Sequence, residues 1–328
     1  MTEIDPFTSV TPSWRSRFRA PLRHLPRGVM RSGLVVLVVL ALLYYPLGAI
    51  LMHKIDDNPD FTAVETVRGE SKAVAMTAAL ITREVDKNGW RANDPFFYPS
   101  AFLDNMPNYQ QGIFDALARF TVEMNDQIGR IRGSSQVDAD LQTASGRLKY
   151  PGTEWLWDPK VSLLPTATSE AQYRNARKAL LDYNRRLGEG AAVFDRRADN
   201  LLSLIDRITS DIGSDSGVID AQVASHAGDM MDFAADDVFY RTKGKLYAYY
   251  LILREIGQDF APIIAERQAQ GAWDQMVGSL RTAAILHPSI IINGSPDAQM
   301  TPSHLISLGF YLLRARTQME EVANILLK

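Results

Sequence analysis

Four residues that could bind a metal ion recur at helical spacing in the second half of the chain. His226, Asp229, Asp232 and Asp236 follow one another at intervals of three, three and four residues, which would place them on one face of a helix. An imidazole and several carboxylates can hold a hard divalent cation. Gly228 interrupts this segment, and several basic residues follow it. We therefore favour a solvated acidic face that pairs with those bases, and we predict no metal, with these four residues as the alternative.

A lysine among tyrosines comes directly after this segment. Lys243, Tyr247, Tyr250 and Arg254 would align on neighbouring turns of a helix, and Tyr240 lies one turn before them. A lysine beside tyrosines in a cleft could act as a general acid or base, or bind an anion. The interpretation that we favour is an amphipathic helix, in which the tyrosine rings pack inward and the lysine stem lies along the surface.

Aromatic and acidic side chains are also concentrated in two Pro-bounded stretches, residues 88–112 and 150–160. Aromatic rings beside carboxylates can stack on sugars, and paired acids are what glycoside hydrolysis requires. The other interpretation is that these loops close one end of a helical bundle. The candidate ligand-binding residues are Trp90, Asp94, Phe97, Tyr98, Asp104, Tyr109, Glu154, Trp155 and Trp157, together with Tyr240, Lys243 and Tyr247.

Motifs of the common enzyme classes are absent from the sequence. It contains no phosphate-binding G-x-x-x-x-G-K-[ST], no H-E-x-x-H, no G-x-S-x-G and no Gly-rich dinucleotide fingerprint. With no cysteine in the chain, a disulfide framework, a thiolate zinc site and a cysteine nucleophile are excluded. We assign no catalytic residue, expect no cofactor, and favour a non-enzymatic role while leaving the question of an enzyme open.

The stretch around which the chain is organised is Gly33–Met52, which carries no charge. Twenty residues of helix extend about 30 Å, the thickness of a bilayer's hydrocarbon core. Six arginines precede it, and mostly acidic residues follow it. The positive-inside rule predicts a cytoplasmic tail, residues 1–32, and an exported domain, residues 53–328. A cleaved signal peptide fits less well, because the apolar run is longer than the ~7–15 residues of a signal core.

The charge of the exported region follows from the totals for the chain. Of 35 basic and 38 acidic residues, six arginines and two acids lie before residue 53, which leaves 29 bases and 36 acids, a net charge of −7. A net-negative domain argues against a nucleic-acid partner.

Helical periodicity dominates the rest of the sequence, and we find no alternating strand pattern of useful length. The apolar stripes predict helices over residues 61–87, 108–131, 137–148, 169–212, 218–228, 239–264, 271–286 and 303–326. Within residues 169–212 the stripe from Tyr173 to Ile212 contains a four-residue stutter at 188–190, typical of either one unwound helix or two tightly joined ones. This stripe is long enough to serve as both core and partner interface.

Glycines, prolines and helix-capping residues give four further local predictions. We expect a break at 213–217, Asp259 as the N-cap of a helix restarting at Pro262, Ser303 as the cap of the last helix, and a candidate strand at Ser289–Ile292. The fold class is all-α: one transmembrane helix followed by a periplasmic bundle of long antiparallel helices, with a possible subdivision near Pro165.

Two stretches of the sequence carry a resemblance to a known family. NGWRANDPFFYPSAFLDNMPNYQQGI (88–113) and DVFYRTKGKLYAYYLILREIGQDF (237–260) resemble bacterial membrane-anchored proteins, mainly proteobacterial, grouped as the domain of unknown function family 2333. The resemblance spans most of the chain. It implies a single-pass bacterial inner-membrane protein with a helical periplasmic domain, and it carries no activity or substrate.

These observations lead to two hypotheses of function. The first is a membrane-anchored periplasmic scaffold or partner-binding protein of the cell envelope, with the bilayer as a partner through residues 33–52 and an envelope protein or a second copy as the other. The second is a protein that binds or processes peptidoglycan or another glycan through the loops at 88–112 and 150–160. A sensor is disfavoured, because the tail is too short for an output domain.

Overall fold

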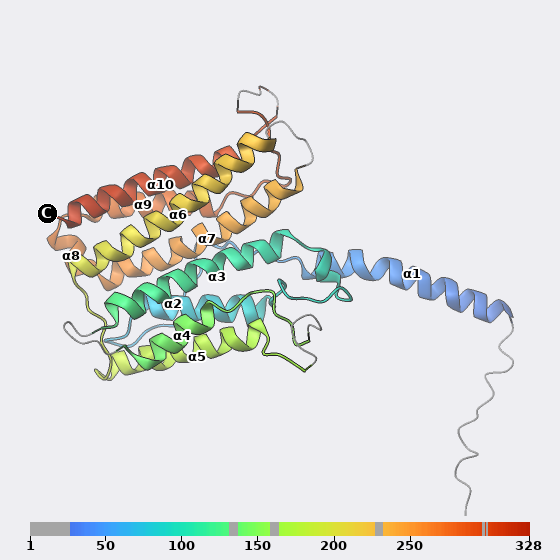
Figure 1. Cartoon of the computed structure of the whole chain (residues 1–328), viewed down its shortest axis with the longest axis horizontal. Helices are drawn as coiled ribbons and strands as arrows, with labels where there is room; N and C mark the ends of the chain where they lie inside the picture. The colour runs from blue at the N-terminus through green and yellow to red at the C-terminus, as the bar shows by residue number, and fades with distance from the viewer. Residues whose placement is uncertain (1–26, 131–136, 158–163, 227–231, 297–298, 300) are drawn as a thin grey trace, which may run out of the picture.

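Helix α1 (Arg27–Met52) projects from one end of the molecule (Figure 1). The computed structural model describes residues 27–130, 137–157, 164–226, 232–296, 299 and 301–328. Pro46 lies inside α1 without ending it, and none of the residues 28–52 is buried. Among the described residues, α1 is the one helix long and apolar enough to cross a membrane, a property that a signal sequence shares.

The remaining helices lie side by side, and successive long helices such as α6 and α7 run in opposite directions (Figure 1). Helices α3 and α7 form the centre, with α2, α4 and α5 on one side and α6, α9 and α10 on the other. Their bounds are α2 (Lys72–Ile81), α3 (Asn105–Glu123), α4 (Ala139–Leu148), α5 (Ser169–Gly188), α6 (Ala198–His226), α7 (Phe233–Asp259), α8 (Ala261–Glu266), α9 (Gln270–Ala284) and α10 (His304–Leu326).

Three short helical elements complete the secondary structure. Helices α2 and α3 continue as π-helical turns, Thr82–Lys87 and Met124–Ile128, and a 3₁₀ turn, η3, covers Pro99–Phe102. In the described part of the chain, β pairing is confined to a single bridge between Asn293 and Ser303. The all-α fold class is confirmed, and the candidate strand at Ser289–Ile292 is wrong.

Two predictions at helix starts differ from the structure, and both involve Asp259. The restart at Pro262 is confirmed, because α8 begins at Ala261 with this proline in its first turn, but its N-cap is Phe260 and not Asp259. The helix predicted from residue 61 begins only at Lys72, so that Val64 is 87% exposed. Asp259, predicted to cap the helix that follows it, instead accepts hydrogen bonds from the Ser71 hydroxyl (2.6 Å) and the backbone N–H groups of Lys72 and Ala73 (3.0 and 3.1 Å). The last residue of α7 thus satisfies the free donors at the start of α2.

Two outcomes concern helix continuity. Residues 169–212 form two helices, α5 and the first part of α6, as one of the two alternatives predicted. Their join is not tight as predicted, because residues 189–197 separate them, and Gly190 in this segment has a positive φ of 71°. The predicted break at 213–217 is wrong, because α6 continues through it and buries Ile212, Ser216 and Ile219. Most of the stripe from Tyr173 to Ile212 is buried in the core, while Ala191 is exposed and Ala198 is half-buried. Ser303 caps α10 as predicted.

Helices α3 and α7 touch through their backbones at a reciprocal pair of glycines. A Cβ atom on Gly112 would lie 1.9 Å from the carbonyl oxygen of Arg241, and one on Gly244 would lie 2.1 Å from that of Tyr109. Neither position admits any side chain unless the helices move apart. The central crossing of the bundle therefore depends on these two residues.

We expect Gly244→Ala to lower the free energy of unfolding by about 3 kcal/mol, because the added methyl group overpacks a backbone contact. Gly217→Ala in α6 is the control, since nothing lies within 4 Å of its Cβ position. It should be neutral or stabilising by about 0.5–1 kcal/mol. Urea unfolding of the full chain in detergent, followed by circular dichroism, measures both. Equal stability of the two variants would contradict the close crossing.

Candidate functional site

The chain that leaves α1 is held along α7 by a row of side chains. We call residues 53–63 the connector. Lys243 Nζ lies 2.6 Å from Asp57 Oδ2, the Tyr247 hydroxyl donates to the Asn58 carbonyl (2.7 Å), and the Tyr250 hydroxyl donates to the Pro59 carbonyl (3.1 Å). The connector therefore runs in the same direction as α7, in contact with three successive turns of it.

Arg254 completes this row one turn further on. Its two terminal nitrogens donate to the carbonyl oxygens of Pro59 (2.9 Å) and Phe61 (2.7 Å), and it also pairs with Glu255 (2.8 Å). The alignment read from the spacing is present in α7. What the row holds is the connector: Tyr247, Tyr250 and Arg254 donate to its backbone carbonyls, and Lys243 pairs with the carboxylate of Asp57.

A buried ionic cluster lies beneath the connector, and sequence reasoning missed it. Arg83 pairs with Glu84 (2.7 Å) and donates to the Tyr247 hydroxyl (2.6 Å), and its guanidinium stacks over Phe61 (4.7 Å to the ring centroid). Burial disfavours the Arg83 cation, but Glu84, followed by Tyr247, more than offsets it, so its pKa is raised. Burial raises the pKa of Tyr247 to about 12 despite the nearby guanidinium. The signal in the sequence was a charged pair inside an apolar stripe.

The ion pair between Lys243 and Asp57 is unequally exposed. The Lys243 side chain is 1% exposed, whereas that of Asp57 is 23% exposed. Burial lowers the pKa of Lys243, although Asp57 favours its charged form. Removal of one partner therefore leaves the lysine charge in a less polar place than the aspartate charge.

We expect Asp57→Ala to cost about 3 kcal/mol of unfolding free energy, because it leaves a buried ammonium group unpaired. Lys243→Met should cost clearly less, since Asp57 keeps access to water and the methionine fills the same volume. Urea unfolding of both variants in detergent compares them. If Lys243→Met lost more unfolding free energy than Asp57→Ala, the lysine charge would not be the one that the ion pair stabilises.

The two aromatic loops meet at the end of the domain from which α1 projects. Trp90 is buried, donates from Nε1 to the Gly152 carbonyl (2.7 Å), and packs edge-on against Phe114 and Tyr173. The Asn93 amide donates to the Glu154 carbonyl (2.8 Å). Trp90 therefore joins the loops internally, while other rings from the same loops remain at the surface.

The remaining candidate ligand-binding residues fall into two groups. Tyr109, Lys243 and Tyr247 are buried, and the Tyr109 hydroxyl donates to the Asp56 carbonyl (3.0 Å). Phe97, Tyr98 and Trp157 are exposed, and Trp155 is half-buried with its ring centroid 5.7 Å from that of Phe97. The candidate ligand-binding residues therefore do not form one site. Some lie in the core under the connector, and others lie on an exposed aromatic surface.

The three candidate acidic residues of the aromatic loops make separate local contacts. Asp94 accepts a hydrogen bond from the Ser100 hydroxyl and lies 3.4 Å from Arg91, and Asp104 caps α3 through the N–H of Asn105 (2.8 Å). Glu154 is half-buried, and its backbone N–H donates to the Ser169 hydroxyl (3.0 Å). Tyr240 is half-buried, and burial, followed by Asp236, raises its pKa.

The metal candidates do not share one helix. His226 ends α6, where its Nδ1 lies 2.7 Å from the Ser225 hydroxyl, and Asp229 lies outside the described residues. Asp232 caps α7 and accepts hydrogen bonds from Gln222 (2.8 Å) and Asn293 (3.0 Å). Over the described ranges, no group of three or more His, Asp or Glu side chains could hold a metal ion.

Asp236 differs from the other described metal candidates because one of its buried oxygens has no hydrogen-bond partner. Its Oδ1 is buried without a hydrogen-bond partner, and burial, followed by Asp104, Asp237 and Asp232, raises its pKa to about 6. Asp232 behaves in the opposite way: burial opposes ionisation, but hydrogen bonds from Gln222 and Asn293 lower its pKa.

Asp236→Asn should therefore stabilise the protein above pH 6. The folded state binds the Asp236 proton more tightly than the unfolded state, so wild-type stability falls as pH rises through about 6. The gain should vanish below about pH 4, near the unfolded pKa. Asp232→Asn is the matched control: it should destabilise at pH 7, and less so as the pH falls. Thermal unfolding from pH 4 to 8 measures both, and a pH-independent gain for Asp236→Asn would contradict the raised pKa.

A second polar feature that the sequence did not suggest is a groove of roughly 560 Å³ between α3, α6, α7 and residues 148–153. Five of its charged side chains form ion pairs within the groove: Arg241 with Asp115 (2.9 Å), and both Arg119 and Lys245 with Asp211 (3.4 and 3.5 Å). These pairs link α3, α6 and α7 across the groove.

The sequence profile of an uncharacterised protein family conserved in bacteria, DUF2333, matches residues 27–231 and 229–328. The chain belongs to this family. The resemblance read from residues 88–113 and 237–260 is confirmed, and the DUF2333 match covers α1, the connector and the whole helical domain. Searches of curated proteins and of solved structures found no match.

Proposed function

We propose that this protein is a single-pass, membrane-anchored helical scaffold or partner-binding protein of the bacterial cell envelope. In this proposal, residues 33–52 cross the inner membrane, the Arg-rich tail stays in the cytoplasm, and the helical domain stands in the periplasm. Its partners are the bilayer and either an envelope protein or a second copy of the chain. No reaction is assigned to it.

The observation that carries the proposal is the exposure of α1. A long apolar helix in which none of residues 28–52 is buried needs another apolar environment, and a bilayer supplies one. Contacts of α1 itself add support. The hydroxyls of Tyr44 and Tyr45 donate to the carbonyl oxygens of Phe97 (3.1 Å) and Phe96 (3.4 Å) in the domain, and a cleaved leader would gain nothing from such contacts.

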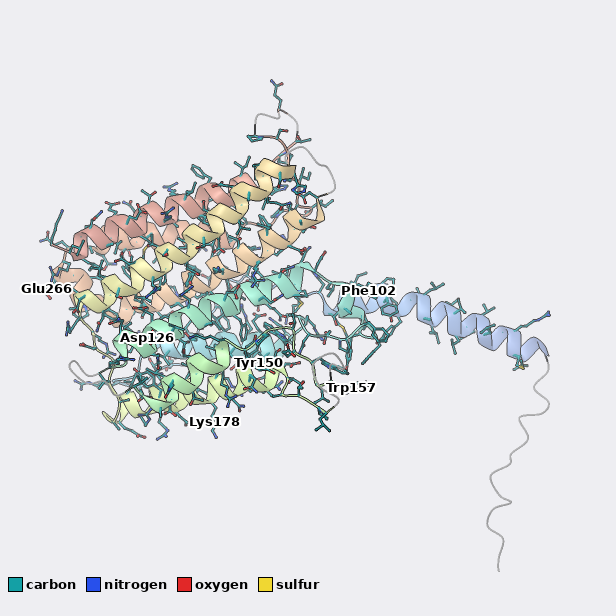
Figure 2. All side chains as sticks on the ribbon, viewed as in Figure 1. Phe102, Asp126, Tyr150, Trp157, Lys178 and Glu266 are labelled. Atoms are coloured by element: carbon teal, nitrogen blue, oxygen red, sulfur yellow. The ribbon has the colours of Figure 1, made fainter. Side chains whose placement is uncertain are left out.

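The absence of native cysteine allows a direct test of topology. We expect a single cysteine introduced at Lys178, an exposed residue of α5, to react with a membrane-impermeant maleimide in cells with a permeabilised outer membrane (Figure 2). A cysteine at Ser9 should react only after the inner membrane is lysed. The intact mass should include residues 1–52. Labelling of both positions before lysis, or loss of the N-terminal segment, would overturn the proposed anchor.

Partner binding needs its own experiment. A photoreactive residue at Phe310, an exposed apolar position on α10, should give adducts with an envelope protein or with a second copy, whereas one at Lys178 should give fewer. Mass spectrometry of the adducts separates the two partners. Equal and diffuse labelling from both positions would count against a specific partner on this face.

A further inference from the structure

Large apolar side chains from the two aromatic loops are exposed together at the end of the domain that carries α1. Phe96 is 80% exposed, Phe102 is 71% exposed and Trp157 is 51% exposed. We call the exposed set the collar; its members are Phe96, Phe97, Tyr98, Phe102, Leu156 and Trp157. A cluster of this kind on a soluble surface marks an interaction site.

The collar is attached to α1 itself. The rings of Tyr45 and Phe102 pack edge-on with centroids 5.0 Å apart, and a Cβ atom on Gly48 would lie 2.3 Å from Cγ of Pro99. Figure 2 shows Phe102 beside the end of α1, and Trp157 on the same end of the domain. Any membrane that surrounds α1 therefore also meets the collar.

The position of these contacts along α1 gives the depth at which the collar would lie in the membrane. They involve residues 44–48, which precede Met52 by four to eight residues. At the helical rise this is about 6–12 Å inside the outer end of the span. A helix needs about 20 apolar residues to cross the hydrocarbon core, so the span cannot end before Tyr44. The collar then reaches the depth of interfacial segments, about 5–10 Å below the headgroups.

The backbone of residues 95–103 suits this location, because irregular chain near lipid must have its polar groups satisfied. Tyr44 and Tyr45 donate their hydroxyls to the carbonyls of Phe97 (3.1 Å) and Phe96 (3.4 Å). The N–H groups of Tyr98, Ala101 and Leu103 donate within the loop (2.8, 3.1 and 2.9 Å). Prolines at positions 95 and 99 carry no N–H at all.

We propose that the collar inserts into the boundary between headgroups and acyl chains of the leaflet in which α1 ends. Aromatic side chains favour this boundary, because their rings are apolar while tyrosine and tryptophan keep a polar atom near water. The domain is then attached to the bilayer at two places, the span and the collar, and lies on the membrane in one orientation. This inference rests on the membrane anchor proposed above.

Site-specific fluorescence in vesicles tests the collar separately from the anchor. The full chain, with a single cysteine at Phe102, Trp157, Leu40 or Lys178, is labelled with an environment-sensitive dye and reconstituted into phosphatidylethanolamine–phosphatidylglycerol vesicles that contain lipids with a spin-labelled acyl chain. We expect a blue shift and quenching at positions 102 and 157 by a shallow label, quenching at position 40 by a deep label, and neither effect at position 178.

Two failures are distinguishable. Quenching at position 40 without quenching at 102 and 157 would overturn the collar and leave the anchor standing. Absence of quenching at all four positions would overturn the anchor, and the collar with it. If the protein sediments with isolated peptidoglycan and Trp157→Ala abolishes this while positions 102 and 157 remain unquenched, the collar binds glycan and the lipid proposal is wrong.

A loss-of-insertion variant completes the test. Phe96→Ser combined with Phe102→Ser should abolish the quenching at position 157 while that at position 40 remains. Leu181→Ser combined with Val218→Ser removes exposed apolar side chains from α5 and α6 and should leave all signals unchanged. Matching circular dichroism spectra would show that both variants fold. Retained quenching at position 157 in the collar variant would contradict a collar that inserts as a unit.

Discussion

Four side chains on one face of α7 hold a segment that has no secondary structure of its own, the connector, and three of them bond to its backbone. Extended chain usually finds hydrogen-bond partners in a neighbouring strand, and the connector has none. Tyr247, Tyr250 and Arg254 donate to its carbonyl groups instead, and Lys243 fixes its register through Asp57. The path of the chain out of α1, and with it the placement of the aromatic loops, depends on this row.

The features that the sequence predicts well are those encoded locally. The long apolar helix α1 follows from the uncharged stretch Gly33–Met52, the start of α10 from Ser303, and the alignment of Lys243 with Tyr247 from helical spacing. The partners of that row could not be predicted, because the connector lies more than 180 residues away in sequence. The division of the aromatic loops into a buried Trp90 and an exposed Trp157 likewise depends on packing between distant segments.

Each wrong prediction has an identifiable physical cause. Val64 and Val67 continue the three-four spacing of α2 by coincidence, and Gly69, with a φ of 99°, turns the chain between them and the helix. Gly213 and Gly217 suggested a break, but burial of Ile212 and Ile219 on one face outweighs the cost of glycine in a helix. Asp259 caps a helix, but its partner is reached through tertiary contact rather than along the chain.

Three separate contacts are made by residues of the single helix α7. Gly244 packs against α3, the row from Lys243 to Arg254 binds the connector, and Asp259 caps the start of α2. A single residue inserted between Gly244 and Asp259 would turn everything beyond it by about 100° and advance it by about 1.5 Å. The glycine crossing and the cap could not then both form. The spacing between these contacts therefore fixes the length of α7. Insertions and deletions among members of the family should be found in the loops and not in this helix.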